Sequence, residues 1–320
     1  MKRLLLYSIL VMIGYGGTTE ACLGARPLSM GGAFVAVADD IHSCYWNPAG
    51  MGNLQGTELT YMQTLNNKAV INYQNWAAGG MKIGNGGIGV SHVKAINPYT
   101  YINSGTDTDP YNYYTNDDWM TLSIGGWGTG LFENTAMGVN IRRYSHALER
   151  RDNLAMMVSG KTTREGMGYV ANATGFDLGF LHKLSDEITL GLLIQDVNKP
   201  KCSFGNEFGS MRHARNFRPG IAWMPDKDTI ISMDIYYLNI KDVYAHELQS
   251  EVRIGAERWL TDKLAIRAGF YGRSFHTIGL GLKSKPAEGS TAPNMLYQID
   301  YGLLESDGDG THFLSATVKF

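Results

Sequence analysis

The stretch Leu264-Ala-Ile-Arg-Ala-Gly-Phe-Tyr271 decides the fold class, because its apolar and polar side chains alternate residue by residue. One face is apolar and consists of Leu264, Ile266, Ala268 and Phe270. The opposite face carries Arg267, Gly269 and Tyr271. A period of two residues is that of a β-strand with two unlike faces.

The same alternation extends outward from this stretch along the chain. We expect about fourteen strands, over residues 57–65, 70–78, 86–95, 118–127, 134–146, 168–182, 187–197, 214–224, 229–239, 248–259, 263–271, 276–284, 294–303 and 311–320. Alternating segments of about ten residues separated by turns are typical of a transmembrane β-barrel. A soluble sandwich of two sheets shows the same alternation, so other features must distinguish the two folds.

The connections between the expected strands are unequal, which favours the membrane barrel. Short polar turns lie at residues 185–187, 226–228 and 261–263, and longer connections lie at 96–117, 147–167 and 198–213. Short periplasmic turns and long outer loops are the rule in outer-membrane barrels. The sequence therefore predicts an all-β fold, an antiparallel transmembrane barrel of about fourteen strands.

Charged residues of both signs occupy the polar faces of the strands. They are Asp234, Glu251, Arg253, Glu257, Arg267 and Asp300. An arginine facing lipid at the bilayer midplane costs about 2–4 kcal/mol. We therefore expect all six to point into the lumen, although the solvated face of a sandwich would also accommodate them.

The chain ends on a strand with an aromatic last residue. The apolar face of that strand consists of Leu314, Ala316, Val318 and Phe320. A closing strand of this kind resembles the signal read by the barrel-assembly machinery, so this machinery and outer-membrane lipids are expected partners. Aromatic girdles at the two membrane interfaces are expected from Trp119, Trp127, Trp223, Trp259, Tyr271 and Tyr301.

Residues 1–21 have the pattern of a cleaved export signal, with a basic start, about a dozen apolar residues and small residues before the cut. No later segment approaches the length of a spanning helix, so an exported chain either stays soluble or enters a membrane as strands. Cys22 follows the predicted cut, which leaves lipidation of Cys22 as an alternative. A bridge between Cys22 and Cys44 is a further alternative.

Residues 22–56 break the rhythm of the strands. They are rich in small and apolar residues, with Ser43 as a candidate helix cap and Asn47-Pro48 as a turn that ends any helix. The segment is too short to cross a membrane as a helix. We expect it to form a plug in the mouth of a barrel built from residues 57–320.

The plug segment also carries a specific resemblance. Residues Arg26 to Asp40 and the following Tyr45-Trp-Asn-Pro-Ala-Gly50 resemble the opening of the FadL/PorV-type outer-membrane proteins, and the last third of the chain is similar as well. The resemblance implies a fourteen-stranded barrel in the outer membrane of a Gram-negative-type bacterium. FadL-like members transport long-chain fatty acids or other hydrophobic compounds, whereas PorV-like members serve type IX secretion.

Two functions follow from this resemblance, and a purely structural barrel is a third alternative. The first is passive uptake of a hydrophobic, long-chain fatty-acid-like molecule, gated by the plug. In that case we expect ligand contacts from Met30, Phe34, Val35 and Val37, and a turn fixed by Asn47, Pro48 and Ala49. The second is a PorV-like role in secretion or surface attachment, in which the barrel binds exported proteins or secretion components.

The sequence predicts no enzyme, no cofactor and no metal site. Its 8 histidines are scattered, and neither a zinc spacing nor a nucleophile elbow nor a phosphate loop is present. A net charge of −2 without a basic run gives no reason to expect nucleic acid as a partner.

Residues 307–310 are expected to form a hairpin turn, with a cation loop as the alternative. Residues 106–118 are expected to form an acidic outer loop, for which a glycan, cation or partner contact is the alternative.

Overall fold

The computed structural model describes residues 23–67, 73–97, 111–152, 168–204, 210–236, 238, 250–272, 275–284, 295–306 and 309–320. The expected signal peptide and Cys22 lie outside the described residues. Cys44 is described, and its thiol is free and buried. Burial raises the pKa of the Cys44 thiol to about 12, so this thiol stays protonated.

Fourteen strands form one closed antiparallel barrel, as the alternation predicted. They are β1 (Thr57–Asn67), β2 (Tyr73–Ile83), β3 (Gly86–Asn97), β4 (Tyr111–Trp127), β5 (Thr135–Asp152), β6 (Gly168–Lys183), β7 (Ile188–Gln195), β10 (Asn216–Asp226), β11 (Thr229–Tyr236), β12 (Glu251–Trp259), β13 (Leu264–Tyr271), β14 (Phe275–Lys283), β15 (Leu296–Ser306) and β16 (Asp309–Lys319). Each strand pairs with its neighbours in this order, and β1 pairs with β16 to close the barrel. Two short strands, β8 (Lys201–Ser203) and β9 (Ser210–Arg212), form a separate hairpin.

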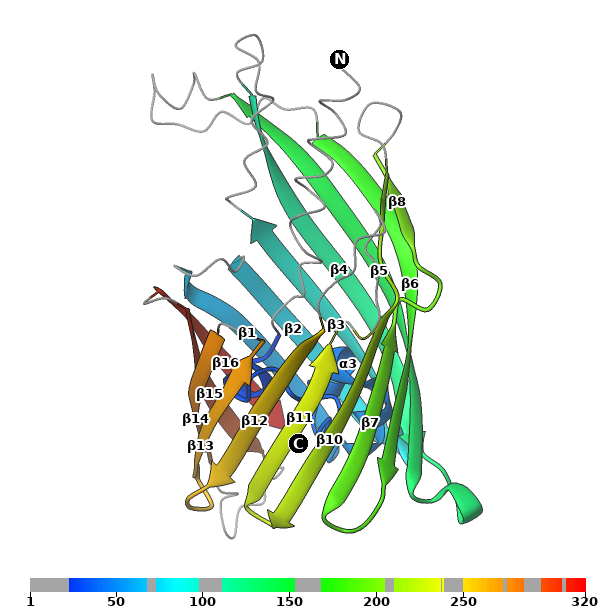
Figure 1. Ribbon diagram of the computed structural model, residues 1–320, viewed down its shortest axis with the longest axis vertical. Coiled ribbons are helices and arrows are strands. Elements are labelled where there is room, and N and C mark those ends of the chain that lie inside the picture. Colours follow the sequence, from blue (N-terminus) through cyan, green and yellow to red (C-terminus); the bar gives the residue numbers. More distant parts are fainter. Residues whose placement is uncertain are drawn as a thin grey trace.

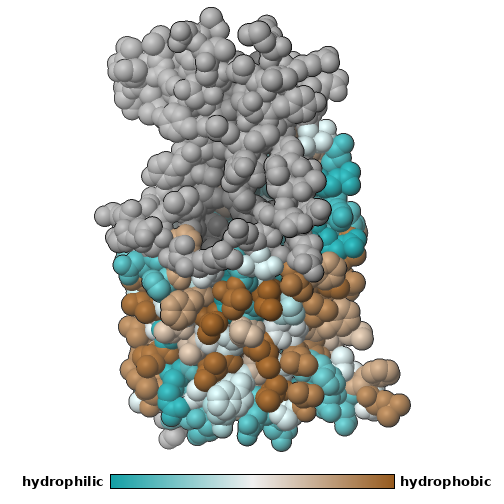
Figure 2. Space-filling view, viewed as in Figure 1, coloured by the Kyte–Doolittle hydropathy of each residue, from teal (hydrophilic) through white to brown (hydrophobic). Residues whose placement is uncertain are grey.

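The two faces of each strand have opposite environments. On β13, Phe270 is 52% exposed on the outside, whereas Arg267 is 4% exposed on the inside. Figure 2 shows apolar side chains gathered in a band on the outer wall, with hydrophilic residues near the rim of the short turns. A soluble sandwich would bury its apolar faces and expose its charges, so this inverted arrangement is that of a wall facing lipid.

The barrel wall is taller on one side than on the other. β4, β5 and β6 rise well above the other strands on one side (Figure 1). β4 begins at Tyr111, so the expected outer loop over residues 106–118 is wrong in its second half, where the chain is already strand. The hairpin expected at residues 307–310 is confirmed by the pairing of Ser306 with Asp309.

Residues 23–54 lie inside the barrel and form the plug (Figure 1). They contain three short helices, α2 (Ala25–Ser29), α3 (Ser43–Trp46) and the 3-10 helix η1 (Pro48–Asn53). α2 packs against β13 to β16, whereas η1 packs against β2 to β6, so the plug crosses the lumen from one wall to the other. Ser43 is the first residue of α3 and its side chain makes no cap hydrogen bond, so its expected capping role is wrong. Among the described residues, no helix is long and apolar enough to cross a membrane.

Most of the expected girdle aromatics lie on the inside. Trp119 and Tyr271 are buried in the lumen, at 5% and 9% exposure. The indole of Trp127 donates to Asn53 Oδ1 of the plug over 2.8 Å. Trp223, in contrast, lies on the outer face and is 45% exposed. The girdle expectation was wrong for Trp119, Trp127 and Tyr271, because a plugged lumen also needs large side chains to fill it.

Candidate functional site

The expected ligand-facing residues of the plug are packed against the rest of the protein. Met30, Phe34 and Val35 are 0% exposed, and Val37 is 7% exposed. The Phe34 ring contacts Trp46 edge to face, with ring centroids 6.3 Å apart. These four residues therefore form the core between plug and wall, and a ligand reaches them only if the plug moves.

One side of the plug is held by charges, in an arrangement we call the charged seat. It consists of Arg26, Asp39 and Asp40 of the plug with Glu257, Arg267 and Asp300 of the wall. Arg26 binds Glu257 through two hydrogen bonds of 2.8 Å, one to each carboxylate oxygen. It also donates to Asp39 over 2.6 Å and to Asp40 over 2.7 Å. Such paired geometry compensates the cost of burying charge.

The electrostatics of the charged seat keep Arg26 and Asp40 ionised. Burial lowers the pKa of Arg26, but Asp39, Glu257 and Asp40 outweigh this and hold the pKa well above its usual value. Burial raises the pKa of Asp40, but His42 and Arg26 outweigh this and hold the pKa well below its usual value. The docked plug is therefore stabilised by permanent charges at neutral pH.

The opposite side of the plug is held by backbone contact, in an arrangement we call the glycine seat. Here Pro48 and Ala49 lie against Gly125, Gly138 and Gly179 of β4, β5 and β6. A Cβ atom at Gly138 would clash with the carbonyl carbon of Pro48 and the amide nitrogen of Ala49. Gly125 and Gly138 are required because the plug backbone approaches them too closely for any side chain, and at Gly179 the close neighbours are the Asn47 side chain and the Pro48 ring.

Asn47 fixes the turn that leads into the glycine seat. Its side-chain amide donates to the carbonyl oxygens of Val35 over 2.9 Å and of Phe180 over 3.0 Å. Its side-chain oxygen accepts from the amide of Ala49 over 3.2 Å. Asn47 therefore ties together the plug turn, the preceding plug segment around Val35 and the wall.

The structure shows where each of the six charged residues expected in the lumen lies. Glu257, Arg267 and Asp300 belong to the charged seat, and Asp234 accepts from the backbone amide of Val35 over 2.9 Å. The Arg253 guanidinium lies over the rings of Tyr236 and Tyr271, at 3.5 and 3.8 Å. Glu251 lies 3.5 Å from Arg253, and its side chain is 35% exposed. Five of the six are thus buried inside, and Glu251 lies partly exposed.

The four residues expected as an assembly signal lie on the closing strand. Leu314 and Phe320 are exposed on the outside, at 39% and 48%. Ala316 is also exposed, and Val318 is half-buried. The backbone of Phe320 exchanges two hydrogen bonds with Thr57, at 2.8 and 2.9 Å. Their recognition by the assembly machinery remains a prediction.

A second polar group inside the barrel was not expected from the sequence. Arg142 on β5 pairs with Asp177 on β6 over 2.8 Å, and the Tyr144 hydroxyl lies 2.9 Å from Asp196. Burial, and then the neighbouring Asp177, raise the pKa of Asp196 to about 7. The sequence could have predicted the inward position of Arg142, because it alternates with apolar Ile141 and therefore lies on the inner face.

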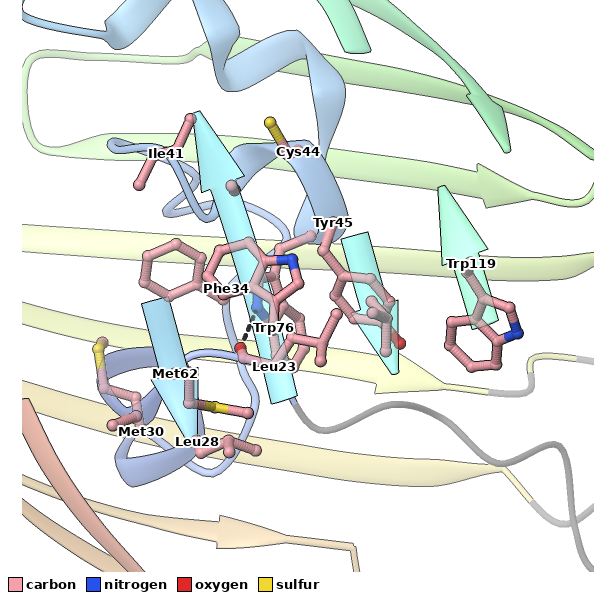
Figure 3. Packing of buried hydrophobic residues seen from close by; sticks show 14 of the residues in the cluster. Leu23, Leu28, Met30, Phe34, Ile41, Cys44, Tyr45, Met62, Trp76 and Trp119 are labelled. Carbon is pink, nitrogen blue, oxygen red and sulfur yellow. Dashed lines mark hydrogen bonds between the residues drawn. The ribbon is translucent and has the colours of Figure 1, made fainter. Parts of the chain in front are cut away.

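The inner wall also has an apolar side that the sequence analysis did not single out. Its members point inward and are buried: Met62, Trp76, Val93, Trp119, Leu304 and Phe313. They belong to one cluster with the plug core (Figure 3). A water-filled porin has a polar interior, so this lining suits apolar contents better than water or sugars.

Comparison with known proteins identifies the fold. No family model matches the sequence, and no curated protein matches it. Among solved structures, the Pseudomonas putida toluene transporter TodX is similar with a TM-score of 0.56 and 12% identity, over 93% of this chain and 98% of that one. The CymD monoaromatic hydrocarbon channel gives 0.56 and 11%, over 93% and 97%. A Pseudomonas aeruginosa FadL homologue gives 0.54 and 12%, over 91% and 96%. The chain therefore has the fold of FadL-type outer-membrane barrels, as the sequence resemblance predicted.

Proposed function

We propose that this protein is an outer-membrane channel for the passive uptake of hydrophobic small molecules, and that its plug is the gate. The observation that carries the proposal is the apolar inner wall, where Trp76 and Phe313 are buried against the plug core. Apolar lining with few polar groups is the general character of sites for hydrophobic ligands.

The solved structures of similar fold support the same class of ligand. Their titles name a toluene transporter and a monoaromatic hydrocarbon channel. They are channels rather than enzymes, which agrees with a chain that binds and passes its ligand unchanged. For this chain we propose long-chain fatty-acid-like molecules as ligands, and monoaromatic hydrocarbons are the alternative to be measured beside them.

The route requires the plug to move. The ligand enters from the side of the long connections, contacts the apolar wall and then meets the buried plug core around Phe34 and Val35. Both seats hold the plug across the lumen, so passage depends on the release of at least one of them. Met30 and Val37 would contact the ligand once the plug shifts.

A reversible cross-link tests whether the plug is a gate. A Cβ atom built at Gly302 lies 3.6 Å from Ser29 Cβ, within the range of a disulfide. The double variant Ser29→Cys/Gly302→Cys should therefore lock α2 to β15 after oxidation. We expect uptake of labelled oleate by cells carrying the locked protein to fall at least tenfold and to recover with a reductant.

The matched controls are the two single cysteine variants, which should transport equally well under oxidising and reducing conditions. Unchanged uptake through the fully cross-linked protein would show that the plug is not the gate. Uptake of both oleate and toluene no faster than in cells without the protein would overturn the uptake function itself. Co-purification of exported proteins, with no bound lipid detected by mass spectrometry, would instead favour a PorV-like role.

A further inference from the structure

A histidine and cysteine cluster lies on the inner side of the tall strands and belongs to neither seat of the plug. It consists of His146 on β5, Cys202 on β8 and His213 just after β9, which we call the outer cluster. The ligating atoms of the three side chains lie within 4.8 Å of one another. Cys202 is 0% exposed and His146 is 6% exposed, whereas His213 is half-buried.

The two imidazoles of the outer cluster are aimed at a common point. Their Nε2 atoms face each other at 3.0 Å. In a tetrahedral zinc site, bond lengths of 2.0–2.1 Å place two nitrogen ligands about 3.3 Å apart. A shift of a few tenths of an ångström would therefore admit one ion between the two rings.

Each imidazole is backed by a carboxylate on its other nitrogen. His146 Nδ1 lies 2.6 Å from Asp117 Oδ1, and His213 Nδ1 lies 3.7 Å from Asp196 Oδ2. Metal-binding histidines nearly always direct their second nitrogen to such a partner, which fixes the ring and its tautomer. The Tyr144 ring stacks on His213, with centroids 4.1 Å apart, and holds that ring in place.

We propose that the outer cluster is a binding site for one zinc-like transition-metal ion. A thiolate and two imidazoles are the donor set that Zn²⁺ prefers, and three protein ligands leave a fourth position for water. Binding forms two metal–nitrogen bonds and one metal–sulfur bond and releases the thiol proton of Cys202. The proposal does not depend on the uptake function.

The consequence of binding is structural. His146 belongs to the barrel wall, whereas Cys202 and His213 lie on and beside the β8–β9 hairpin. The hairpin already touches β6, and the amide of His213 donates to the carbonyl oxygen of Pro200 over 2.9 Å. The ion would therefore fasten the hairpin to β5 and fix its position on the inner wall.

Metal titration of the purified, chelator-treated barrel in detergent tests the site. We expect one equivalent of Zn²⁺ to bind, and one equivalent of Co²⁺ to give the charge-transfer absorption of a cobalt–thiolate bond. Cys202→Ser should abolish this absorption, whereas Cys44→Ser at the other described cysteine should leave it unchanged. Asp117→Asn should weaken zinc binding about 10–100-fold through loss of the carboxylate partner.

His213→Gln provides an independent variant, because His213 lies outside the barrel strands and its replacement leaves the wall intact. Folding of every variant is checked by the shift of the unheated barrel on a denaturing gel. Absence of a one-equivalent site in the native protein would overturn the proposal. It would equally be overturned if folded Cys202→Ser kept the cobalt–thiolate band, or if folded His213→Gln bound zinc as tightly as the native chain.

Discussion

The two seats of the plug differ in the charges they carry, although close backbone packing against wall glycines also occurs beside the charged seat, where Gly255 lies against Met30. At the charged seat, Arg26 is buried among carboxylates from both plug and wall. At the glycine seat, Pro48 touches wall glycines through its backbone. Charges hold strongly but can be neutralised or left unpaired, whereas backbone packing is insensitive to pH and intolerant of added volume. If the plug is the gate, as we propose, we expect the charged seat to be the side that releases.

The largest expected effect is loss of the arginine from the charged seat. Arg26→Gln leaves Asp39, Asp40 and Glu257 without their shared cation, and removal of one partner from a buried ion pair costs about 3–5 kcal/mol. We expect the free energy that holds the plug in the barrel to fall by about this amount. The measurement is protease cleavage within residues 23–56 in the folded barrel.

The matched control is Arg258→Gln on β12. The Arg258–Asp226 pair has side chains that are 55% and 47% exposed, and surface pairs contribute only about 0–1 kcal/mol. If Arg26→Gln protected the plug as well as this control does, the charged seat would not be what holds the plug.

A volume change should break the glycine seat instead. Gly138→Val places side-chain atoms where the backbone of Pro48 and Ala49 lies, and overpacking of this kind costs about 1–3 kcal/mol or more. We expect the plug to leave β5 while the barrel still assembles, as measured by protease cleavage near Pro48. Met137→Val, on the lipid-facing side of the same strand, should have no such effect. An uncleaved plug in Gly138→Val would refute the close approach.

Removal of the turn's hydrogen bonds should weaken the glycine seat more mildly. Asn47→Ala deletes the donors to Val35 and Phe180, each bond contributing about 0.5–1.5 kcal/mol. Hydrogen exchange of the amides in residues 33–50 should accelerate, with the barrel strands unchanged. Unaltered exchange there would show that backbone packing alone holds the turn.

The smallest effect is a dependence of plug docking on pH. Asp40 has a lowered pKa when docked and an ordinary pKa, near 3.8, when released. Docking therefore releases a proton, so its stabilisation is complete above about pH 4 and is lost as the pH falls further. Protease sensitivity of the plug should increase below pH 4. Asp40→Asn should reduce this increase, and an identical profile in Asp40→Asn would remove Asp40 as the cause.

The sequence predicted the strands with useful accuracy, because each wall segment meets only two environments. Ile266 and Phe270 face outward, and Arg267 faces inward, as their alternation required. The plug segment was recognised from its composition and its Asn47-Pro48 turn. What could not be predicted was which inward residues the plug contacts. Arg26 and Glu257 are separated by 231 positions, and no local pattern links them.

The aromatic residues and the outer cluster show the same limit. Trp119 and Tyr271 lie at the ends of the strands expected from the sequence, but both fill the lumen, and Trp119 lies in the middle of the longer β4 of the structure. His146, Cys202 and His213 come from three separate elements, so their spacing resembles no metal motif. Both the inward aromatic residues and the outer cluster depend on contacts between segments that are far apart in the sequence.

By itself, the sequence determined the class of fold and which face points outward on the strands with clear alternation, such as β13. It could do so because lipid is a uniform environment. Successive side chains of a strand point alternately toward lipid and toward the interior, so the apolar or polar character of each residue indicates which way it faces. The tertiary structure alone decided how the interior is used, including the two seats, the apolar wall and the outer cluster. Interior contacts join specific atoms from distant segments, and those distances are set only when the barrel has closed around the plug.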